Sequence, residues 1–250
     1  MKGTIGTTRH KEEDLREMPF FGHLDELRKV LVQSAYAFCG LMVISWFFSG
    51  QILDYITKPL PVQSLYFLNP TEAFMVRVRI SLVGGIMLAF PFILYRVWAF
   101  VAPGLFARER KKIVPFLVAS SALFYAGVLF CFFVLIPIVL KFFLDYGTAR
   151  LNPLISVDSY FSFIARLSFA FGIVFQLPVI VLVLSLLGIV KPHWLLHQWR
   201  YGILAIFIAS AILTPPDAIS MMAMALPVLV LYAASIIIAF VVVRRKSSDE

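Results

Sequence analysis

The chain has 250 residues, of which 61% are apolar, and its mean hydropathy is +0.90. Soluble domains are usually about 45–50% apolar, and here the excess falls in blocks, so the composition excludes an ordinary soluble domain and indicates an integral membrane protein. The chain is also strongly basic, with 22 Lys+Arg against 14 Asp+Glu.

Six runs without a charged side chain predict six membrane helices. A spanning helix needs about 20 apolar residues. Four runs reach that length, the second reaches it by extending past Arg96, and the fifth is short. The runs are Val30–Leu53, Ile80–Tyr95, Ile113–Leu140, Leu167–Val190, Tyr201–Pro216 and Ala218–Val243. We therefore predict an all-α integral membrane protein, with a charged cytoplasmic tail (1–19), a six-helix transmembrane domain (20–243) and a second cytoplasmic tail (244–250).

The stretch FGHLDELRK, residues 21–29, directly precedes the first run. Its apolar residues fall on one helical face, which indicates an amphipathic segment that lies at the membrane surface and bends into the first helix. Asp25 has Lys29 at i+4 as an intrahelical partner. Glu26 can reach Lys29 at i+3 but would have to share it.

The second helix is preceded by NPTEAF, residues 69–74, in which Pro70 and Thr71 open a helix and Glu72 lies in its first turn. After this helix comes the basic loop ARERKK, in which Glu109 is the one acidic residue.

Five prolines are predicted to bend the later helices and to enclose a concave face: Pro91, Pro115, Pro137, Pro178 and Pro227. In the fourth run, Gln176 is the most notable polar residue deep in a span. Between the fifth and sixth runs, LTPPD forms a tight connection in which Asp217 can cap the last helix.

Lys and Arg beside the runs predict the side that each loop faces, because cytoplasmic loops carry the excess of these residues. Most of them lie in the N-terminal tail, in the loops after the second and fourth runs, and at the C-terminus. The remaining loops hold Lys58, Lys141 and Arg150. Six helices with both termini in the cytoplasm follow. No transit peptide is apparent, which favours a prokaryotic cytoplasmic (inner) membrane.

The motifs of several function classes are missing from the sequence. It contains no H-E-x-x-H, no G-x-S-x-G and no P-loop, and its acidic residues lie outside the uncharged runs or at their edges. Cys39 and Cys131 both lie in apolar blocks, which argues against a disulfide framework. These observations disfavour an intramembrane enzyme and an ion-coupled transporter.

Glu26 and Glu109 share the cytoplasmic face in this topology. Each has a simple structural explanation: Glu26 suits a helix N-terminus, and Glu109 suits a surface ion pair, which contributes only about 0–1 kcal/mol. Two carboxylates beside the membrane would also suit a paired guanidinium ligand, through bidentate hydrogen bonds. The residues alone leave both interpretations open.

Five motifs together resemble the twin-arginine protein translocase subunit TatC. They are HLDELRK, NPTEAF, FPFILYRVWAFVAPGLFARERK, YFSFIARLSFAFGIVFQLPV and LTPPD, spread from about Phe20 to Val243. Each motif is weak alone, whereas their order on a six-helix topology is specific. The resemblance implies a curved, glove-like fold.

The same resemblance implies a receptor that binds twin-arginine signal peptides on the cytoplasmic side and exports folded proteins. Transport would use the proton-motive force, without a nucleotide or another cofactor. The family glutamates thought to receive the arginines match Glu26 and Glu109, and Arg28 and Phe100 match further family positions near them.

The implied partners are single-span TatA-type and TatB-type subunits, further TatC copies and membrane lipids, with no nucleic acid. Pro59, Gln176 and Asp217 match structural or partner-interface positions. Three positions depart from the common pattern: Gln176 and Ala233 stand where many members have glutamate, and Ser220-Met221 where many have Ser-Gln. The alternatives are a small-molecule or ion transporter and a purely structural scaffold, and for the scaffold reversing the charge of Glu26 or Glu109 would cost little.

Overall fold

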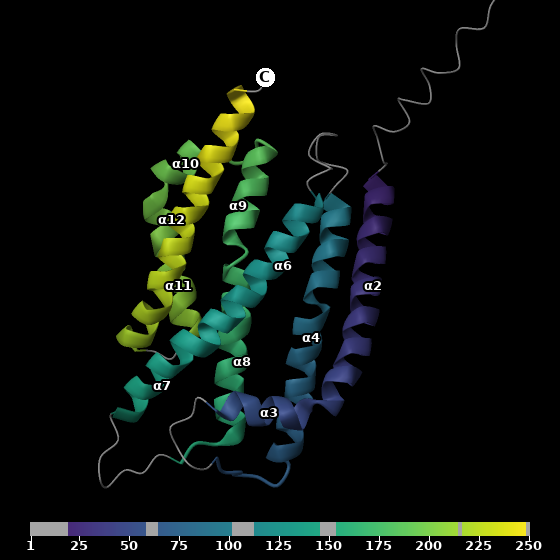
Figure 1. Cartoon of the computed structure of the whole chain (residues 1–250), viewed down its shortest axis with the longest axis vertical. Helices are drawn as coiled ribbons and strands as arrows, with labels where there is room; N and C mark the ends of the chain where they lie inside the picture. Colours follow the sequence, from purple (N-terminus) through teal and green to yellow (C-terminus); the bar gives the residue numbers. More distant parts are fainter. Residues whose placement is uncertain (1–19, 59–64, 102–112, 146–153, 215–216, 249–250) are drawn as a thin grey trace, which may run out of the picture.

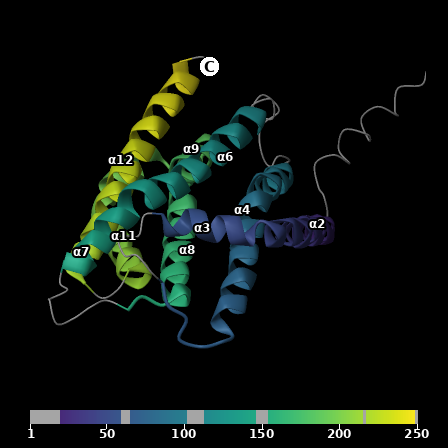
Figure 2. The ribbon, with the colours of Figure 1, turned by 60° about the horizontal axis from the view of Figure 1, so that its bottom comes forward.

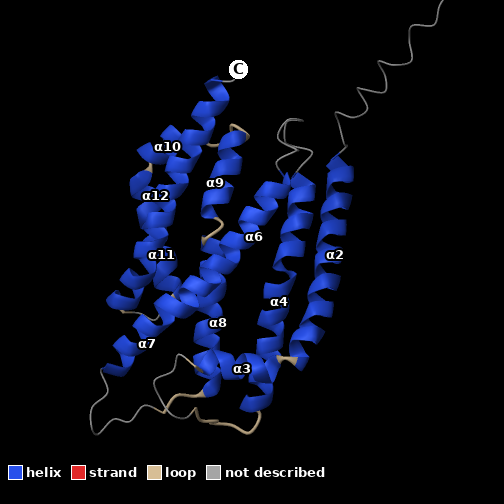
Figure 3. Ribbon diagram, viewed as in Figure 1, coloured by secondary structure: helices blue, strands red, loops and turns tan. Residues whose placement is uncertain are grey.

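The computed structural model describes residues 20–58, 65–101, 113–145, 154–214 and 217–248. Within these ranges the regular structure is helical, joined by short loops (Figure 3). In chain order the elements are α2 Phe20–Phe47, α3 Ser49–Thr57, α4 Glu72–Val101, α6 Ile113–Phe130, a π-helical segment Cys131–Leu135, α7 Ile136–Asp145, α8 Val157–Val174, α9 Leu177–Leu186, α10 Pro192–His197, α11 Trp199–Leu213 and α12 Ala218–Ser248.

Six apolar segments form the body of the molecule, as the sequence predicted. Five are long and apolar enough to cross a membrane: Leu24–Phe47, Glu72–Phe100, Val114–Asp145, Val157–Leu186 and Ala218–Val242. The sixth, α11, has 15 residues and measures about 22 Å at 1.5 Å per residue, less than the hydrocarbon core of about 30 Å. The prediction of a short fifth helix is confirmed.

The first predicted span does not continue to Leu53. α2 ends at Phe47, where the Phe48 N–H donates to the Ser45 carbonyl (3.2 Å) in a tight turn. α3 then lies transversely across the lower end of the bundle and bridges α4 and α8 (Figures 1 and 2). The reason is amphipathicity: Ile52 and Ile56 pack on a buried cluster of α4 and α8 residues, while Asp54 stays exposed.

The prolines predicted to bend the later helices lie next to an irregularity in two spans, whereas Pro91 and Pro227 lie within helices that continue through them. Pro91 lies inside α4, and Pro137 follows the π-helical segment. The fourth span is broken into α8 and α9, with Pro178 in the first turn of α9. Pro115 is an exception, because it is the third residue of α6 and no intrahelical hydrogen bond is lost in a first turn.

An apolar hollow of about 190 Å³ lies between α3, α4, α6 and α8. It is consistent with the concave face predicted from the bent helices. The main core beside it is formed by side chains of the π-helical segment, α7 and α8, with Phe171 fully buried.

The helix ends fall on two sides of the molecule (Figure 1). The start of α2, the end of α4, the start of α6, the end of α9 and the end of α12 lie at the upper end of the view. α3 and the starts of α4 and α8 lie at the lower end. The span ends therefore fall into two groups at opposite ends of the bundle, and which group faces the cytoplasm stays a prediction.

Candidate functional site

The start of α2 presents two neighbouring acids in different environments. The Lys29 ammonium lies 2.8 Å from the Asp25 carboxylate, and both side chains are exposed. Glu26 is half-buried and, among the described residues, makes no hydrogen bond or close ion pair. Arg28 is exposed. The predicted competition for Lys29 is therefore resolved in favour of Asp25, and no other described residue binds the Glu26 carboxylate.

α2 and α4 pack side by side in antiparallel fashion, which positions Glu26 (Figure 1). A Cβ added to Gly85 would lie 2.7 Å from the Met42 Cα, so the two backbones approach closely there. Glu26 precedes Met42 by as many residues as Val101 follows Gly85. Because both helices rise equally per residue, Glu26 lies level with the end of α4, where Phe100 is found.

The end of α4 is fixed by an aromatic contact. Trp98 stacks on Phe116 of α6, with ring centroids 5.6 Å apart, and packs against Val179 and Val183 of α9. Phe100, two residues further on, is half-buried. Contacts among α4, α6 and α9 therefore fix the end of α4 that carries Phe100. The close approach of Gly85 and Met42 holds α2 beside α4.

Two of the predicted site residues lie outside the described residues. Glu109 falls between Val101 and Ile113 in the sequence, and Pro59 follows α3. The structure therefore brings Glu26, Arg28 and Phe100 to one end and does not place the other two.

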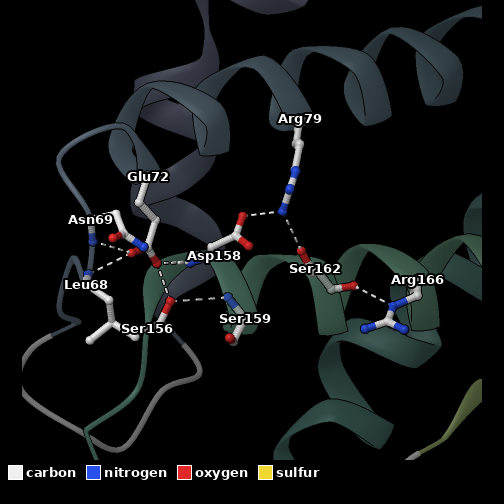
Figure 4. A network of polar contacts seen from close by, with 9 residues as sticks. All are labelled: Leu68, Asn69, Glu72, Arg79, Ser156, Asp158, Ser159, Ser162 and Arg166. Carbon is white, nitrogen blue, oxygen red and sulfur yellow. Dashed lines mark hydrogen bonds and ion pairs between the residues drawn. The ribbon is translucent and has the colours of Figure 1, made fainter.

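At the opposite end, Glu72 binds three separate segments together (Figure 4). One carboxylate oxygen accepts from the backbone N–H groups of Leu68 (2.7 Å) and Asn69 (3.3 Å). The other accepts from the Ser156 hydroxyl and from the Asp158 N–H (3.0 Å). Glu72 is only 8% exposed. The sequence predicted its place in the first turn of the helix but not this role, because its partners lie in the preceding loop and at the start of α8.

An ion pair extends the same network. Arg79 of α4 pairs with Asp158 and donates to the Ser162 hydroxyl (3.1 Å), and the Ser162 carbonyl accepts from Arg166 (3.3 Å) (Figure 4). Asp158 therefore pairs with Arg79 of α4 through its carboxylate, and its backbone N–H donates to the Glu72 carboxylate. α4 and α8 are joined here by a buried carboxylate and an exposed ion pair.

Gln176 lies at the break between α8 and α9 and is buried. Its side-chain amide donates to the Ser120 carbonyl of α6 (3.0 Å). Ser120 is thus linked to the broken span through a polar group that would otherwise be buried without a partner. Gln176 therefore joins α6 to the break between α8 and α9. Its role at a partner interface stays a prediction.

Asp217 caps the last helix, as the sequence predicted. One of its oxygens accepts from the Ser220 N–H at 2.6 Å, directly before α12 begins at Ala218. Such a cap satisfies a donor that the first turn leaves free.

In the described part of the chain, no group of three His, Cys, Asp or Glu residues is arranged to hold a metal ion. The acids of the two ends instead serve as hydrogen-bond acceptors. At the lower end Glu72 uses both of its carboxylate oxygens within the chain, while Asp54 is exposed on α3. At the upper end Glu26 makes no hydrogen bond or close ion pair with another described residue, and it lies level with Phe100.

The chain is similar to proteins of one family along most of its length. The model of the family "Sec-independent protein translocase protein (TatC)" matches residues 22–227. The TatC protein of Carboxydothermus hydrogenoformans is 39% identical, over 94% of this chain and 98% of that protein. The TatC protein of Aquifex aeolicus is 37% identical, over 92% and 98%. A crystal structure of the twin-arginine translocase receptor TatC superposes with a TM-score of 0.79 at 36% identity and covers 88% of this chain and 98% of that one.

Proposed function

This chain belongs to the TatC family of Sec-independent protein translocase proteins, and on that premise we propose that its Glu26 end receives the paired arginines of a signal peptide. Members of this family are components of a protein translocase, and the family is not a family of enzymes. The chain is accordingly a multi-pass membrane protein of protein translocation, and the transporter alternative is not favoured.

One observation carries the proposal: Lys29 is engaged by Asp25, and Glu26 is left half-buried without a close partner among the described residues. A carboxylate at a membrane rim is attracted to a cation, and an arginine can bind it through two parallel hydrogen bonds. An ordinary capping acid would instead contact the backbone of its own helix. Within the part of the chain that the structure describes, Glu26 makes no such contact.

Three further residues complete the proposed site. Glu109 would supply a second carboxylate for the second arginine, since it follows the end of α4 that lies level with Glu26. Phe100 would give an aromatic surface to the apolar part of the peptide. Arg28, exposed two residues after Glu26, would lie at the edge of the same site. Lysine would bind less well than arginine, because it lacks the planar fork.

The orientation and partners follow from the same proposal. Both termini would face the cytoplasm, because the span ends that adjoin the basic tails and the ARERKK loop in the sequence lie at the Glu26 end. The partners would be single-span TatA-type and TatB-type subunits and further TatC copies, with the proton-motive force as the energy source. Pro59, Gln176 and Asp217 would act at the outer and central regions, where partner subunits are held.

The test is site-specific photo-crosslinking in membranes. Crosslinkers placed beside Glu26 and beside Glu109 are exposed to a signal peptide with two arginines and to the same peptide with two lysines. Crosslinks at both positions that depend on the arginines are expected. No crosslink, or equal crosslinks to both peptides, would remove the two acids from the receptor site while leaving family membership intact.

A further inference from the structure

The elbow between α10 and α11 carries a hollow that the proposed receptor site does not use. The hollow measures about 610 Å³ and is lined by both polar and apolar atoms of residues 196–201 and of Leu204. Its floor is the break at Gln198, which ends one helix and precedes the next. α12 flanks the elbow, and the Tyr232 hydroxyl donates to the Leu195 carbonyl (3.3 Å) (Figure 1).

The elbow is positively charged and has no acid near it in the sequence. Lys191 and Arg200 are exposed, and residues 159–216 contain no Asp or Glu. The Arg200 guanidinium lies 6.0 Å from the Trp199 ring, so a cation–π contact holds it at the hollow.

The elbow also carries exposed aromatic and apolar side chains. Trp194 and Trp199 are exposed, and Tyr201 and Leu204 are 71% and 57% exposed. Trp and Tyr at the end of a membrane segment mark the level of the lipid headgroups. Leu204 lies one turn inside α11, so the wall of the hollow passes from charged to apolar over the height of a single helical turn.

We propose that this elbow binds the headgroup of an anionic phospholipid, with Arg200 at the phosphate, with Lys191 adding positive charge from the start of α10, and with Leu196 and Leu204 against the upper acyl chains. Clusters of basic residues beside a membrane helix bind anionic headgroups. A free phosphate ion or an acidic peptide would match the charge, but neither would cover the two exposed leucines. The site is independent of the signal-peptide receptor at α2 and α4.

Native mass spectrometry of the full-length protein in detergent tests the proposal, with phosphatidylglycerol and phosphatidylcholine of identical acyl chains as probes. The wild type is expected to bind the first phosphatidylglycerol several-fold more tightly. Arg200→Gln should weaken it about fivefold, as expected for removing one cation close to an anionic headgroup, and should leave phosphatidylcholine within about twofold. Arg200→Lys should retain most of the affinity. Lys191→Gln, tested in parallel, should weaken phosphatidylglycerol in the same direction.

Lys141→Gln is the matched control, because it removes one exposed cation from α7, far along the chain from the elbow. Equal affinity of the wild type for the two lipids would overturn the proposal. So would unchanged phosphatidylglycerol binding in both Arg200→Gln and Lys191→Gln, or an equal loss in Lys141→Gln. Displacement of the lipid by millimolar inorganic phosphate, or by an oligoglutamate peptide, would also overturn the proposal. The elbow would then be a site for a free anion or for an acidic peptide.

Discussion

The Lys29 ammonium lies 2.8 Å from the Asp25 carboxylate, although Glu26 is also within helical reach of it. An i,i+4 pair with the acid on the N-terminal side is the favoured orientation on a helix, because it also suits the helix dipole. The pairing separates two adjacent acids into one that is neutralised within the helix and one that is not. The first two predictions depend on that separation.

Glu26→Gln should weaken the binding of a twin-arginine peptide at least tenfold. It removes the charge from the acceptor of a charge-assisted pair, which is worth about 1.5–3 kcal/mol. Affinity measured with a labelled peptide on membranes or purified protein checks it. Asp54→Asn, on the exposed face of α3 at the other end, is the matched control and should bind as the wild type does.

Asp25→Asn should weaken the same peptide only about twofold, and indirectly. Without Asp25, Lys29 is free to pair with Glu26 at i+3, and such helical pairs contribute about 0.2–0.5 kcal/mol. Adding Lys29→Gln should restore the affinity, because the competing cation is gone. A double variant as weak as the single one would show that Asp25 itself contacts the peptide.

Gly85→Ala should destabilise the protein by about 1–3 kcal/mol, the usual cost of overpacking. The new methyl would lie 2.7 Å from the backbone of Met42, which cannot move aside as a flexible side chain could. The apparent melting temperature in detergent should fall. Gly40→Ala, in α2, is the control: nothing lies within 4 Å of its Cβ position, so it should be neutral or slightly stabilising. Equal melting temperatures for the two variants would contradict the close contact.

Glu72→Gln should be nearly as damaging as Glu72→Ala. Each carboxylate oxygen accepts from at least one backbone N–H, so an amide NH₂ in either orientation would face a donor. The expected loss of stability is about 2–3 kcal/mol, since hydrogen bonds to charged groups are the stronger ones. Hydrogen exchange at Leu68, Asn69 and Asp158 should accelerate in both variants. Ser156→Ala removes one of the four hydrogen bonds to Glu72 and should lower the free energy of unfolding by about 1 kcal/mol. A Glu72→Gln variant as stable as the wild type would show that the network does not require the carboxylate.

Several features of the chain were predictable because they depend on local pattern. Hydropathy blocks gave the six membrane segments and the short α11. The position of Asp217 before an apolar run gave its cap, and the i,i+4 spacing gave the Asp25–Lys29 pair. Such features require knowledge of only a few neighbouring residues.

Features that join distant segments could not be predicted in the same way. The break at Phe48 falls inside an uncharged run, directly before Ser49-Gly50-Gln51. α3 turns aside there because Ile52 and Ile56 pack on a cluster built from α4 and α8. Gln176 could be singled out as a buried polar residue, but its partner is a backbone carbonyl of α6. Backbone carbonyls carry no sequence signal, so only packing identifies which one is in reach.

By itself, the sequence determined the membrane class, the number of spans, the charge asymmetry of the loops and the candidate acids, because each is a matter of composition or of spacing within a few turns. Only the tertiary structure decided that Glu26 lies level with Phe100, through the contact of Gly85 with Met42. It likewise decided that both carboxylate oxygens of Glu72 accept hydrogen bonds from the chain itself, whereas no other described residue donates to Glu26. The physical reason is that an acid's availability depends on which donors surround it in space, and for Glu72 half of those donors come from α8, far away in the sequence.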